Sequence, residues 1–293
     1  MEQRKSYHSQ YCLDGMEGIW ILKPTGMSRG RGITCMNNLS EIMQYIISSD
    51  CEFVAQKYIE RPMIIKKRKF DVRQWALVNS FDPLEVWIFD EFYVRFAAND
   101  YNYDNLSDVY THLTNNSITK DHQDKGLINV FEDNMMSMEN FKKEMETKKQ
   151  EKIDKLRQQK DQNGLSQIQE TDYFMKIKKR IEELVVLTQK AGNKFVNSRK
   201  GSFCVFGYDF MVDEDFNVWL IEINTSPDMT HSTPVTTRLV PEFQSDIVKW
   251  VTDYNVFGKR NEEADLGKLK RIYKEKVLSA KDRLAARFGK KTK

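Results

Sequence analysis

The pattern of apolar and polar positions predicts a chain rich in strands over its first hundred residues. Short runs of β-branched and aromatic residues that end at Gly, Pro or Asp predict strands at 19–24, 33–35, 53–59, 70–79, 84–89 and 92–96. Apolar residues at helical spacing predict helices over 38–48, 172–193 and 240–254. Residues 138–162 are charged and poor in apolar side chains, which predicts a solvated helix or a disordered insertion. We expect an α+β fold with antiparallel or mixed sheets.

A polar pair interrupts an apolar strand late in the chain. The run over 218–227 is dense in β-branched and aromatic residues, and its alternation places Glu222 and Asn224 on one face. We expect the other face to belong to the core; it carries Trp219, Ile221 and Ile223. Burying an acid and an amide is costly unless they bind something.

A second strand precedes this run across a short polar loop. If Asp213 pairs with Val218, the antiparallel register places Asp209 opposite Glu222. Asp209, Glu222 and Asn224 then converge on one face, and oxygen ligands shared with substrate phosphates are what Mg²⁺ prefers. A hairpin edge with solvated polar residues is the alternative. The apolar neighbours favour the metal site.

A glycine-rich loop follows Lys23, the last residue but one of the first strand. Its sequence over 26–32 is Gly-Met-Ser-Arg-Gly-Arg-Gly. Glycines allow backbone N–H groups to approach phosphate oxygens, and Lys and Arg neutralise phosphate charge. The loop has neither the Gly-Lys-Ser/Thr of a P-loop nor the dinucleotide-binding glycine pattern. Combined with the metal hairpin, it predicts an ATP site between two sheets.

Other expected strands carry polar residues at positions where a core residue would be usual. These positions are Gln56 and Lys57; Lys69, Asp71 and Arg73 on one strand face; and Arg95. Each one alone is explained about as well by an ion pair at a strand edge, but together with the metal triad they indicate a site. The polar segment 112–117 fits a turn as well as a catalytic role.

Composition and cysteine usage narrow the class of protein. The chain has 293 residues, of which 40% are hydrophobic, enough to bury a core. Its four cysteines show no paired spacing, so we expect neither a zinc site nor disulfides, and we expect a reducing compartment. No apolar stretch is long enough for a signal peptide or a membrane span, which predicts a soluble cytoplasmic protein.

The net charge of +3 conceals an asymmetry between the end of the chain and the rest. Residues 258–293 hold 13 Lys or Arg against 5 Asp or Glu. A basic amphipathic helix is predicted there by apolar residues every three or four positions, at Leu266, Leu269, Tyr273, Val277, Ala280 and Leu284. Such a helix suits an acidic partner or a surface, and a solvated helix without a partner is equally compatible.

Six motifs, in one order, resemble those of tubulin tyrosine ligase-like enzymes over roughly residues 19–255. They are Lys23-Pro24 with its Arg-Gly-Arg-Gly loop, Gln56-Lys57-Tyr58-Ile59, Lys69-Phe70-Asp71-Val72-Arg73, Arg95-Phe96, His112-Leu113-Thr114-Asn115, and Asp209 with Glu222-x-Asn224-x-Ser226-Pro227. Within that family, the segments over 73–78 and 82–87 resemble the tubulin glycylases. In glutamylases, the Phe-Asp-hydrophobic sequence that corresponds to residues 70–72 is more often followed by Arg-Ile-Tyr.

The resemblance implies an ATP-grasp fold, in which two mixed or antiparallel sheets flanked by helices hold the nucleotide. The family's N-terminal lobe is expected to be missing or truncated, because 22 residues precede Lys23. The expected domains are a truncated N-terminal segment with the central subdomain over 1–80, a C-terminal subdomain over 81–257 with a charged insertion at about 138–170, and a basic helical tail over 258–293.

The resemblance also implies roles for individual residues. Nucleotide binding would involve Lys23 on the α/β phosphates, Arg29, Gly30, Arg31 and Gly32 in the covering loop, Gln56, Lys57, Tyr58 and Ile59 around the adenine, and Lys69 and Asp71 facing base and sugar. Catalysis would involve Arg73 and Arg95 on the γ-phosphate and the acyl-phosphate, with His112, Thr114 and Asn115 positioning nucleotide and intermediate. Mg²⁺ would be held by Asp209, Glu222 and Asn224.

The implied activity is that of an ATP-dependent acid–amino-acid ligase. ATP would phosphorylate a glutamate side chain of a tubulin C-terminal tail, and the amine of glycine would attack the acyl-phosphate. We expect a basic surface for the acidic tail, formed by Arg61, Lys66, Lys67, Arg68 and the terminal helix. The expected setting is the cytoskeleton, in cilia or axonemes, with no membrane partner.

Alternative functions remain open at this point. A tubulin glutamate ligase would use the same scaffold with a different amino-acid pocket. A catalytically silent microtubule-binding paralogue would keep the fold and the basic tail. Nucleic-acid binding through the tail is disfavoured, because the sequence has no recognisable module and no stacking aromatic cluster.

Overall fold

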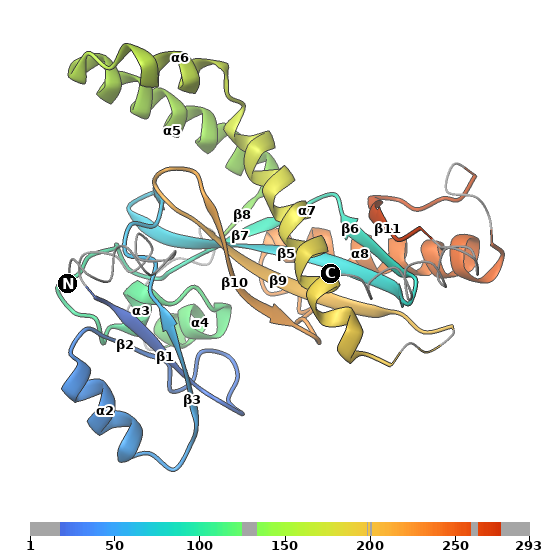
Figure 1. Cartoon of the computed structure of the whole chain (residues 1–293), viewed down its shortest axis with the longest axis horizontal. Helices are drawn as coiled ribbons and strands as arrows, with labels where there is room; N and C mark the ends of the chain where they lie inside the picture. The colour runs from blue at the N-terminus through green and yellow to red at the C-terminus, as the bar shows by residue number, and fades with distance from the viewer. Residues whose placement is uncertain (1–17, 125–133, 198, 200, 259–262, 277–293) are drawn as a thin grey trace, which may run out of the picture.

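The computed structural model describes residues 18–124, 134–197, 199, 201–258 and 263–276, which form a small sheet, a large sheet and the helices around them (Figure 1). The small sheet has the order β2-β1-β3 and is antiparallel throughout. Its strands are β1 (Trp20–Pro24), β2 (Thr34–Met36) and β3 (Phe53–Lys57). The glycine-rich loop therefore joins two neighbouring strands, as the sequence predicts.

Helix α2 (Leu39–Ile47) connects β2 to β3 and begins where the sequence predicts a helix. The Asn38 side chain accepts hydrogen bonds from the backbone N–H groups of Ser40 at 2.9 Å and Glu41 at 3.3 Å. This satisfies two of the N–H groups that lack a partner within the first turn of a helix. The cap explains why the chain turns into a helix directly after β2.

The large sheet is antiparallel and has eight strands. Its main order is β10-β9-β5-β6-β11, with β4 and β7 also paired to β5 and with β8 paired to β7. The strands are β4 (Ile64–Ile65), β5 (Arg68–Phe81), β6 (Leu84–Phe89), β7 (Tyr93–Phe96), β8 (Met135–Ser137), β9 (Cys204–Val212), β10 (Val218–Asn224) and β11 (Leu269–Lys274). The expected domain division at residue 80 falls inside β5, whose 14 residues run without a break.

Helices cover both faces of the large sheet. On one face, α5 (Met138–Gln159) and α7 (Tyr173–Gly192) bury apolar residues such as Phe141 and Ile177 against β5, β6 and β9. On the other face, α8 (Pro234–Lys249) packs Phe243 on Trp75, with ring centroids 4.8 Å apart. This helix continues as a π-helical segment, Trp250–Val256. The three long helical predictions are confirmed, although α8 starts six residues earlier than predicted.

The charged segment after β8 is helical. Helix α5 and the shorter α6 (Gln162–Glu170) pack against each other and project from the body of the molecule in Figure 1. Phe141 and Met145 anchor the first turns of α5 in the core, and Ile153 is buried farther along. Of the two predicted alternatives the solvated helix is correct, because these few apolar residues suffice to fix it.

The prediction of a helix for the basic tail is wrong over residues 269–274. These residues form β11, which pairs antiparallel with β6 and closes one edge of the sheet. Their helical spacing is coincidental, since pairing with an available sheet edge overrides a local pattern. The basic side chains are engaged within the molecule, because Lys270 bonds Glu182 and Arg271 bonds Glu85. The remaining positions of the predicted helix, from Val277 onward, lie outside the described residues.

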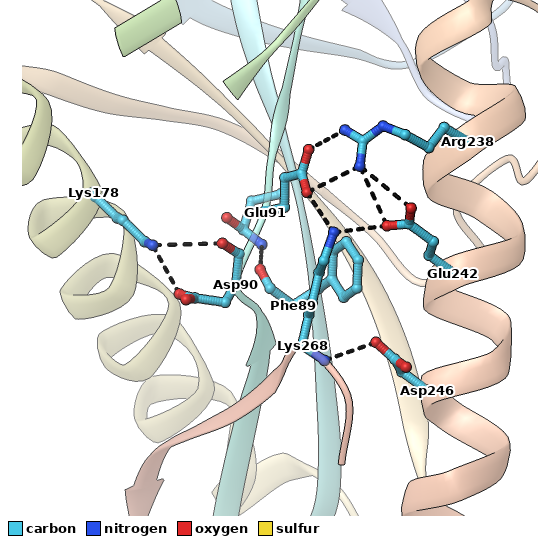
Figure 2. A network of polar contacts seen from close by, with 9 residues as sticks. Phe89, Asp90, Glu91, Lys178, Arg238, Glu242, Asp246 and Lys268 are labelled. Atoms are coloured by element: carbon cyan, nitrogen blue, oxygen red, sulfur yellow. Dashed lines mark hydrogen bonds and ion pairs between the residues drawn. The ribbon is translucent and has the colours of Figure 1, made fainter. Parts of the chain in front are cut away.

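An ion-pair network fastens the chain just before β11 (Figure 2). Lys268 Nζ lies 2.8 Å from Glu91 and 2.7 Å from Glu242, and Arg238 of α8 also contacts both carboxylates. The backbone N–H of Lys268 donates to Asp246 at 2.8 Å. Burial tends to raise the pKa of Glu91, but hydrogen bonds from Arg238 and Lys268 lower it below its usual value. The Lys268 ammonium group is therefore engaged in ion pairs within the fold.

Two short helices, α3 (Val109–His112) and α4 (Asn116–Asp124), follow β7 and carry the polar segment singled out in the sequence. Figure 1 shows them beside the small sheet. Among the described residues, no helix is both long enough and apolar enough to cross a membrane.

Candidate functional site

The predicted site residues meet where the small sheet faces the β5-β9-β10 part of the large sheet. Gln56 Nε2 of β3 donates to the backbone oxygen of Ile221 in β10 at 3.4 Å. Burial lowers the pKa of Lys23 in β1, while the charges of Glu222 and Asp209 act on the same ammonium group and raise it. Residues far apart in the sequence therefore lie within electrostatic range of each other.

The β9–β10 hairpin brings the predicted metal ligands together by a route that differs from the prediction. Val218 pairs with Val212 and not with Asp213. A bulge before Glu222 takes up the extra residue, so Glu222 still lies opposite Asp209. The predicted pairing at the turn is wrong by one residue, and the predicted position of Asp209 opposite Glu222 is confirmed.

The prediction that Trp219, Ile221 and Ile223 face the core from β10 is wrong. Trp219 and Ile221 are only partly buried, and Ile223 is 38% exposed. The residues of β10 that pack on the core are Val218 and Leu220. The reason is that β10 is the edge strand of the sheet, and its bulge interrupts the alternation on which the prediction relied.

Two arginines and two aspartates form a buried quartet on β5, β7 and β9. Arg95 donates to both oxygens of Asp71, from Nε at 2.8 Å and from Nη2 at 2.5 Å, and lies 2.8 Å from Asp209. Arg73 Nε donates to Asp209 at 2.5 Å. Asp71 also accepts from the Thr114 hydroxyl at 2.6 Å. Cross-strand register fixes this arrangement, since Asp71 pairs with Arg95 and Arg73 with Asp209.

The neighbouring carboxylates of the hairpin carry opposite pKa shifts. Burial raises the pKa of Asp209, but Arg95 and Arg73 outweigh it and hold the pKa at about 2. Burial raises the pKa of Glu222, and the charge of Asp209 raises it further. Asn224 Nδ2 lies 3.2 Å from Glu222 and 3.5 Å from Asp209. Negative charge at Glu222 is therefore disfavoured until a cation joins the cluster.

The donor set fits a cation that is shared with a phosphate. Among the described residues, no three His, Cys, Asp or Glu side chains gather into a closed metal cage. Asp209 and Glu222 offer carboxylate oxygens, and rotation of the Asn224 amide would add a third oxygen. A carboxylate has about four lone-pair sites, and Asp209 uses three of them, for Arg73 Nε, Arg73 Nη2 and Arg95 Nη2, which leaves about one available. Mg²⁺ commonly takes few protein oxygens and completes its shell with phosphate and water.

The glycine-rich loop packs on the start of α4. Arg29 and Gly30 adopt left-handed backbone angles, with φ of 63° and 76°. A Cβ on Gly30 would lie 3.2 Å from Asn115 Oδ1, and the Ser117 hydroxyl donates to the Arg29 backbone oxygen at 3.0 Å. Glycine is needed at position 30 for both its angle and its space. The side chains of Arg29 and Arg31 remain exposed.

Tyr58, His112 and Lys69 form a buried polar chain behind the loop. The Tyr58 hydroxyl lies 2.9 Å from His112 Nδ1 and accepts from Lys69 Nζ at 3.0 Å. Burial lowers the pKa of Lys69 to about 8. Burial also lowers the pKa of His112, assisted by the charge of Lys69. His112 is therefore held neutral between Tyr58 and the backbone oxygen of Asn105, 3.1 Å from Nε2.

The remaining predicted residues make local contacts. Lys57 Nζ bonds Glu60 at 2.5 Å and the Ile19 backbone oxygen at 2.9 Å. Arg31 Nε donates to the Ser28 backbone oxygen at 3.3 Å. Ile59 lies just beyond β3 and is half-buried. These contacts place the residues at the border of the site and do not by themselves define a nucleotide pose.

Two residues of the site, Glu60 and Gly207, were not predicted from the sequence. Glu60 is buried and accepts from the Ile19 N–H at 3.0 Å as well as from Lys57. It follows the end of its strand, where no periodicity marks it. Gly207 of β9 has no room for a side chain, since a Cβ would lie 2.8 Å from Pro227 and 3.4 Å from Arg73. A glycine inside a strand was the signal that could have revealed it.

Comparison with known proteins identifies the class to which this fold and site belong. The model of the tubulin-tyrosine ligase family matches residues 1–160 and 147–263. The chain belongs to the tubulin-tyrosine ligase family, and the resemblance read from its motifs is confirmed.

Several relatives with names are similar over nearly the whole chain. Tubulin glycylase 3C of Tetrahymena thermophila is 42% identical over 285 residues, which cover 96% of this chain and 25% of that protein. Tubulin monoglycylase TTLL3 of Homo sapiens is 35% identical, covering 94% of this chain and 33% of that protein. Protein monoglycylase TTLL8 of Homo sapiens is 34% identical, covering 93% and 30%. The chain thus spans about a quarter to a third of the length of these relatives.

Proposed function

We propose that this chain is an ATP-dependent ligase that joins glycine to glutamate side chains of tubulin C-terminal tails. One observation carries the proposal: Lys23 on the small sheet lies within electrostatic range of Asp209 and Glu222 on the large sheet, where Asp209 is paired with Arg73 and Arg95. The names of the glycylase relatives support glycine as the amino acid and tubulin as the acceptor. We further propose that the two sheets form an ATP-grasp clasp around the nucleotide.

We assign each site residue a role in binding the nucleotide or the metal according to its position in the fold. Lys23 and the loop over 29–32 would hold the phosphates. Residues 56–59, at the end of β3 and just beyond it, would border the base. Lys69 and Asp71 would face base and sugar. Mg²⁺, when bound by Asp209, Glu222 and Asn224, would supply charge neutralisation for the phosphoryl group.

The reaction then needs two bond exchanges. A carboxylate oxygen of the acceptor glutamate attacks the γ-phosphorus, which breaks the bond to ADP and forms an acyl-phosphate. The glycine nitrogen attacks the acyl carbon, phosphate leaves, and the nitrogen loses a proton as the isopeptide bond forms. Arg73 and Arg95 would stabilise the negative charge in both steps, since buried donors act strongly in a dry site. His112, Thr114 and Asn115 would position the reacting groups.

The structure reduces the set of basic residues that we propose to contact the acidic tubulin tail. Arg61 pairs with Glu214 at 2.6 Å, and Arg68 is buried with its guanidinium over the Phe96 ring. Lys66 and Lys67 are exposed at the tip of the β4–β5 turn, with φ of 51° and 62°. We propose these two lysines as the contact with the tubulin tail. A cytoskeletal location, in cilia or axonemes, belongs to the same proposal.

The test is incorporation of radiolabelled glycine, and separately of radiolabelled glutamate, into microtubules in the presence of ATP and Mg²⁺. Transfer of glycine and not of glutamate supports the proposal. Transfer of glutamate would retain the ligase chemistry and overturn the choice of amino acid. Microtubule binding without transfer of either one would support a silent binding protein instead.

A further inference from the structure

Three polar side chains outside the roles assigned above join three separate segments beside the site. Asn134, just before β8, donates through Nδ2 to Asn116 Oδ1 at 2.9 Å. Asn116, the first residue of α4, donates through Nδ2 to the Ser232 hydroxyl at 3.1 Å. Ser232 directly precedes Thr233, which caps α8. We call Asn116, Asn134 and Ser232 the amide cluster.

The amide cluster contains a buried acceptor without a donor. Asn134 is 5% exposed, and its Oδ1 accepts no hydrogen bond from the part of the chain that the structure describes. The hydroxyl of Thr119, one turn into α4, is 2% exposed and likewise makes no bond to a described residue. Buried polar atoms are rarely left unpaired, because the lost hydration is not replaced. The other end of the Asn134 amide bonds Asn116, so the free oxygen lies at the start of α4.

Two helix N-termini meet at the same place. Helix α4 begins at Asn116 and helix α8 at Pro234, and the bond between Asn116 and Ser232 holds the two starts together. The first N–H groups of a helix lack partners within the helix, and its dipole favours a negative charge there. Pro234 has no N–H and the Thr233 hydroxyl already accepts from the Thr236 N–H, so the donors for a carboxylate come from the start of α4. They lie beside the unpaired oxygen of Asn134, which is suited to an N–H group. A small amino acid carries both of these groups.

The amide cluster adjoins the phosphate end of the site. Thr114, two residues before Asn116, bonds Asp71 of the arginine–aspartate quartet. The backbone oxygen of Asn134 accepts from the N–H of Phe96, the neighbour of Arg95, at 3.0 Å. A ligand at the cluster would thus lie next to the arginines proposed to hold the acyl-phosphate.

We propose that the amide cluster binds the free amino acid that is joined to the acceptor glutamate, an inference that rests on the proposed function. The N-terminus of α4 and the Ser232 hydroxyl bind its carboxylate. Asn134 Oδ1 accepts one N–H of its amine, which leaves the nitrogen lone pair directed at the acyl carbon. Asn134 is neutral and so does not require the amine to stay protonated.

The test compares two Asn→Leu variants in steady-state transfer assays. Asn134→Leu keeps the shape of the side chain and removes both the unpaired oxygen and the bond from Nδ2 to Asn116. It is expected to raise the KM for glycine at least about tenfold, the loss of one hydrogen bond in a buried site, and to leave the KM for ATP within about twofold. Asn99→Leu is the matched control, because both ends of the Asn99 amide are already bonded, to Asp108 and to His122. It is expected to leave the KM for glycine unchanged.

The outcomes separate this inference from the proposed function. An unchanged KM for glycine in Asn134→Leu, or an equal rise in both KM values, overturns the inference. If Asn134→Leu does not fold, Ser232→Ala, at a half-buried position, carries the same expectation. If wild type transfers no amino acid, the proposed function fails, and the site is tested by NMR titration of ¹³C-glycine with the Mg²⁺ complex of a non-hydrolysable ATP analogue. Binding that Ser232→Ala weakens supports the site; absent or unaltered binding overturns it.

Discussion

Arg73 and Asp209 face each other across β5 and β9, with Nε of the arginine 2.5 Å from a carboxylate oxygen and both side chains buried. The pair lies at the centre of the quartet that also contains Arg95 and Asp71. Breaking a buried ion pair from one side strands the remaining charge in a poorly hydrated place. The same pair therefore bears on both the stability of the fold and the chemistry of the site.

Asp209→Leu is expected to lower the free energy of unfolding by roughly 3–5 kcal/mol, because Arg73 and part of Arg95 lose their counter-charge. Urea denaturation followed by circular dichroism measures this. Arg61→Met is the control, since its pair with Glu214 is exposed and is expected to contribute at most about 1 kcal/mol. Equal losses in the two variants would contradict the importance assigned to the buried quartet.

Lys69 should make stability rise with pH in the mildly alkaline range. Burial lowers its pKa to about 8 in the folded protein, whereas a free lysine has a pKa of about 10.4. Between these values the unfolded chain binds more protons, so the free energy of unfolding increases with pH, by about 3 kcal/mol in full. The penalty is complete below pH 8, where Lys69 is charged in both states.

The pH test compares wild type with Lys69→Met between pH 8 and 10. Cys35 acts in the opposite sense in this range, because burial raises the pKa of its thiol to about 11. The difference between the two proteins reports Lys69 together with its effect on Cys35, because the charge of Lys69 lowers the pKa of that thiol. The variant should lack the upward component, and parallel curves for the two proteins would show that the Lys69 ammonium is not destabilised by burial.

Gly207→Ala should disturb Arg73 without adding or removing a charge. The new Cβ would lie 2.8 Å from Pro227 and 3.4 Å from the Arg73 guanidinium. Overpacking of this kind costs about 1–3 kcal/mol and should reduce transfer activity by displacing Arg73. In the control Gly192→Ala, the new Cβ meets nothing within 4 Å, and a gain of up to about 1 kcal/mol is expected from helix propensity. Thermal unfolding measures the change in stability, and glycine transfer measures the change in activity. Wild-type values of both in Gly207→Ala would refute the close packing of Gly207 against Pro227 and Arg73.

Lys268→Met should weaken the attachment of β11, since Lys268 Nζ bridges Glu91 and Glu242 (Figure 2). The side chains are partly exposed, so a loss of about 1 kcal/mol is expected, and it should shrink as salt is added. Denaturation at low and high ionic strength measures the loss. A loss that does not depend on salt would contradict the part assigned to the ion pairs of Lys268.

Local patterns predicted most of the fold, and tertiary pairing explains where they failed. The strands around the turn at 81–83 and the helix capped by Asn38 follow from alternation and capping, which act over a few residues. The strand β11 could not be foreseen, because its sequence suits a helix until the free edge of β6 is available. The exposure of Ile223 also depends on sheet order, which makes β10 an edge strand.

The sequence was a better guide to which residues lie in the candidate site than to how those residues pair with one another. Polar residues at core-facing strand positions, such as Asp71 and Arg95, stand out in any alternating pattern, and the structure brings them together. Their pairing with each other depends on the register among β5, β7 and β9, which the sequence alone does not determine. The bulge before Glu222 compensated for a register error of one residue. Asn134 has no strand or helix pattern around it, and only its buried, unpaired oxygen distinguishes it.

The most direct test of the central claim, that the two sheets build one Mg²⁺–nucleotide site, is calorimetric titration of a non-hydrolysable ATP analogue with and without Mg²⁺, in wild type and in Glu222→Gln. We expect Mg²⁺ to tighten binding to wild type at least about tenfold, and Glu222→Gln to keep the metal-free affinity but lose most of this gain. An equal gain from Mg²⁺ in both proteins, or no nucleotide binding by folded wild type, would contradict it.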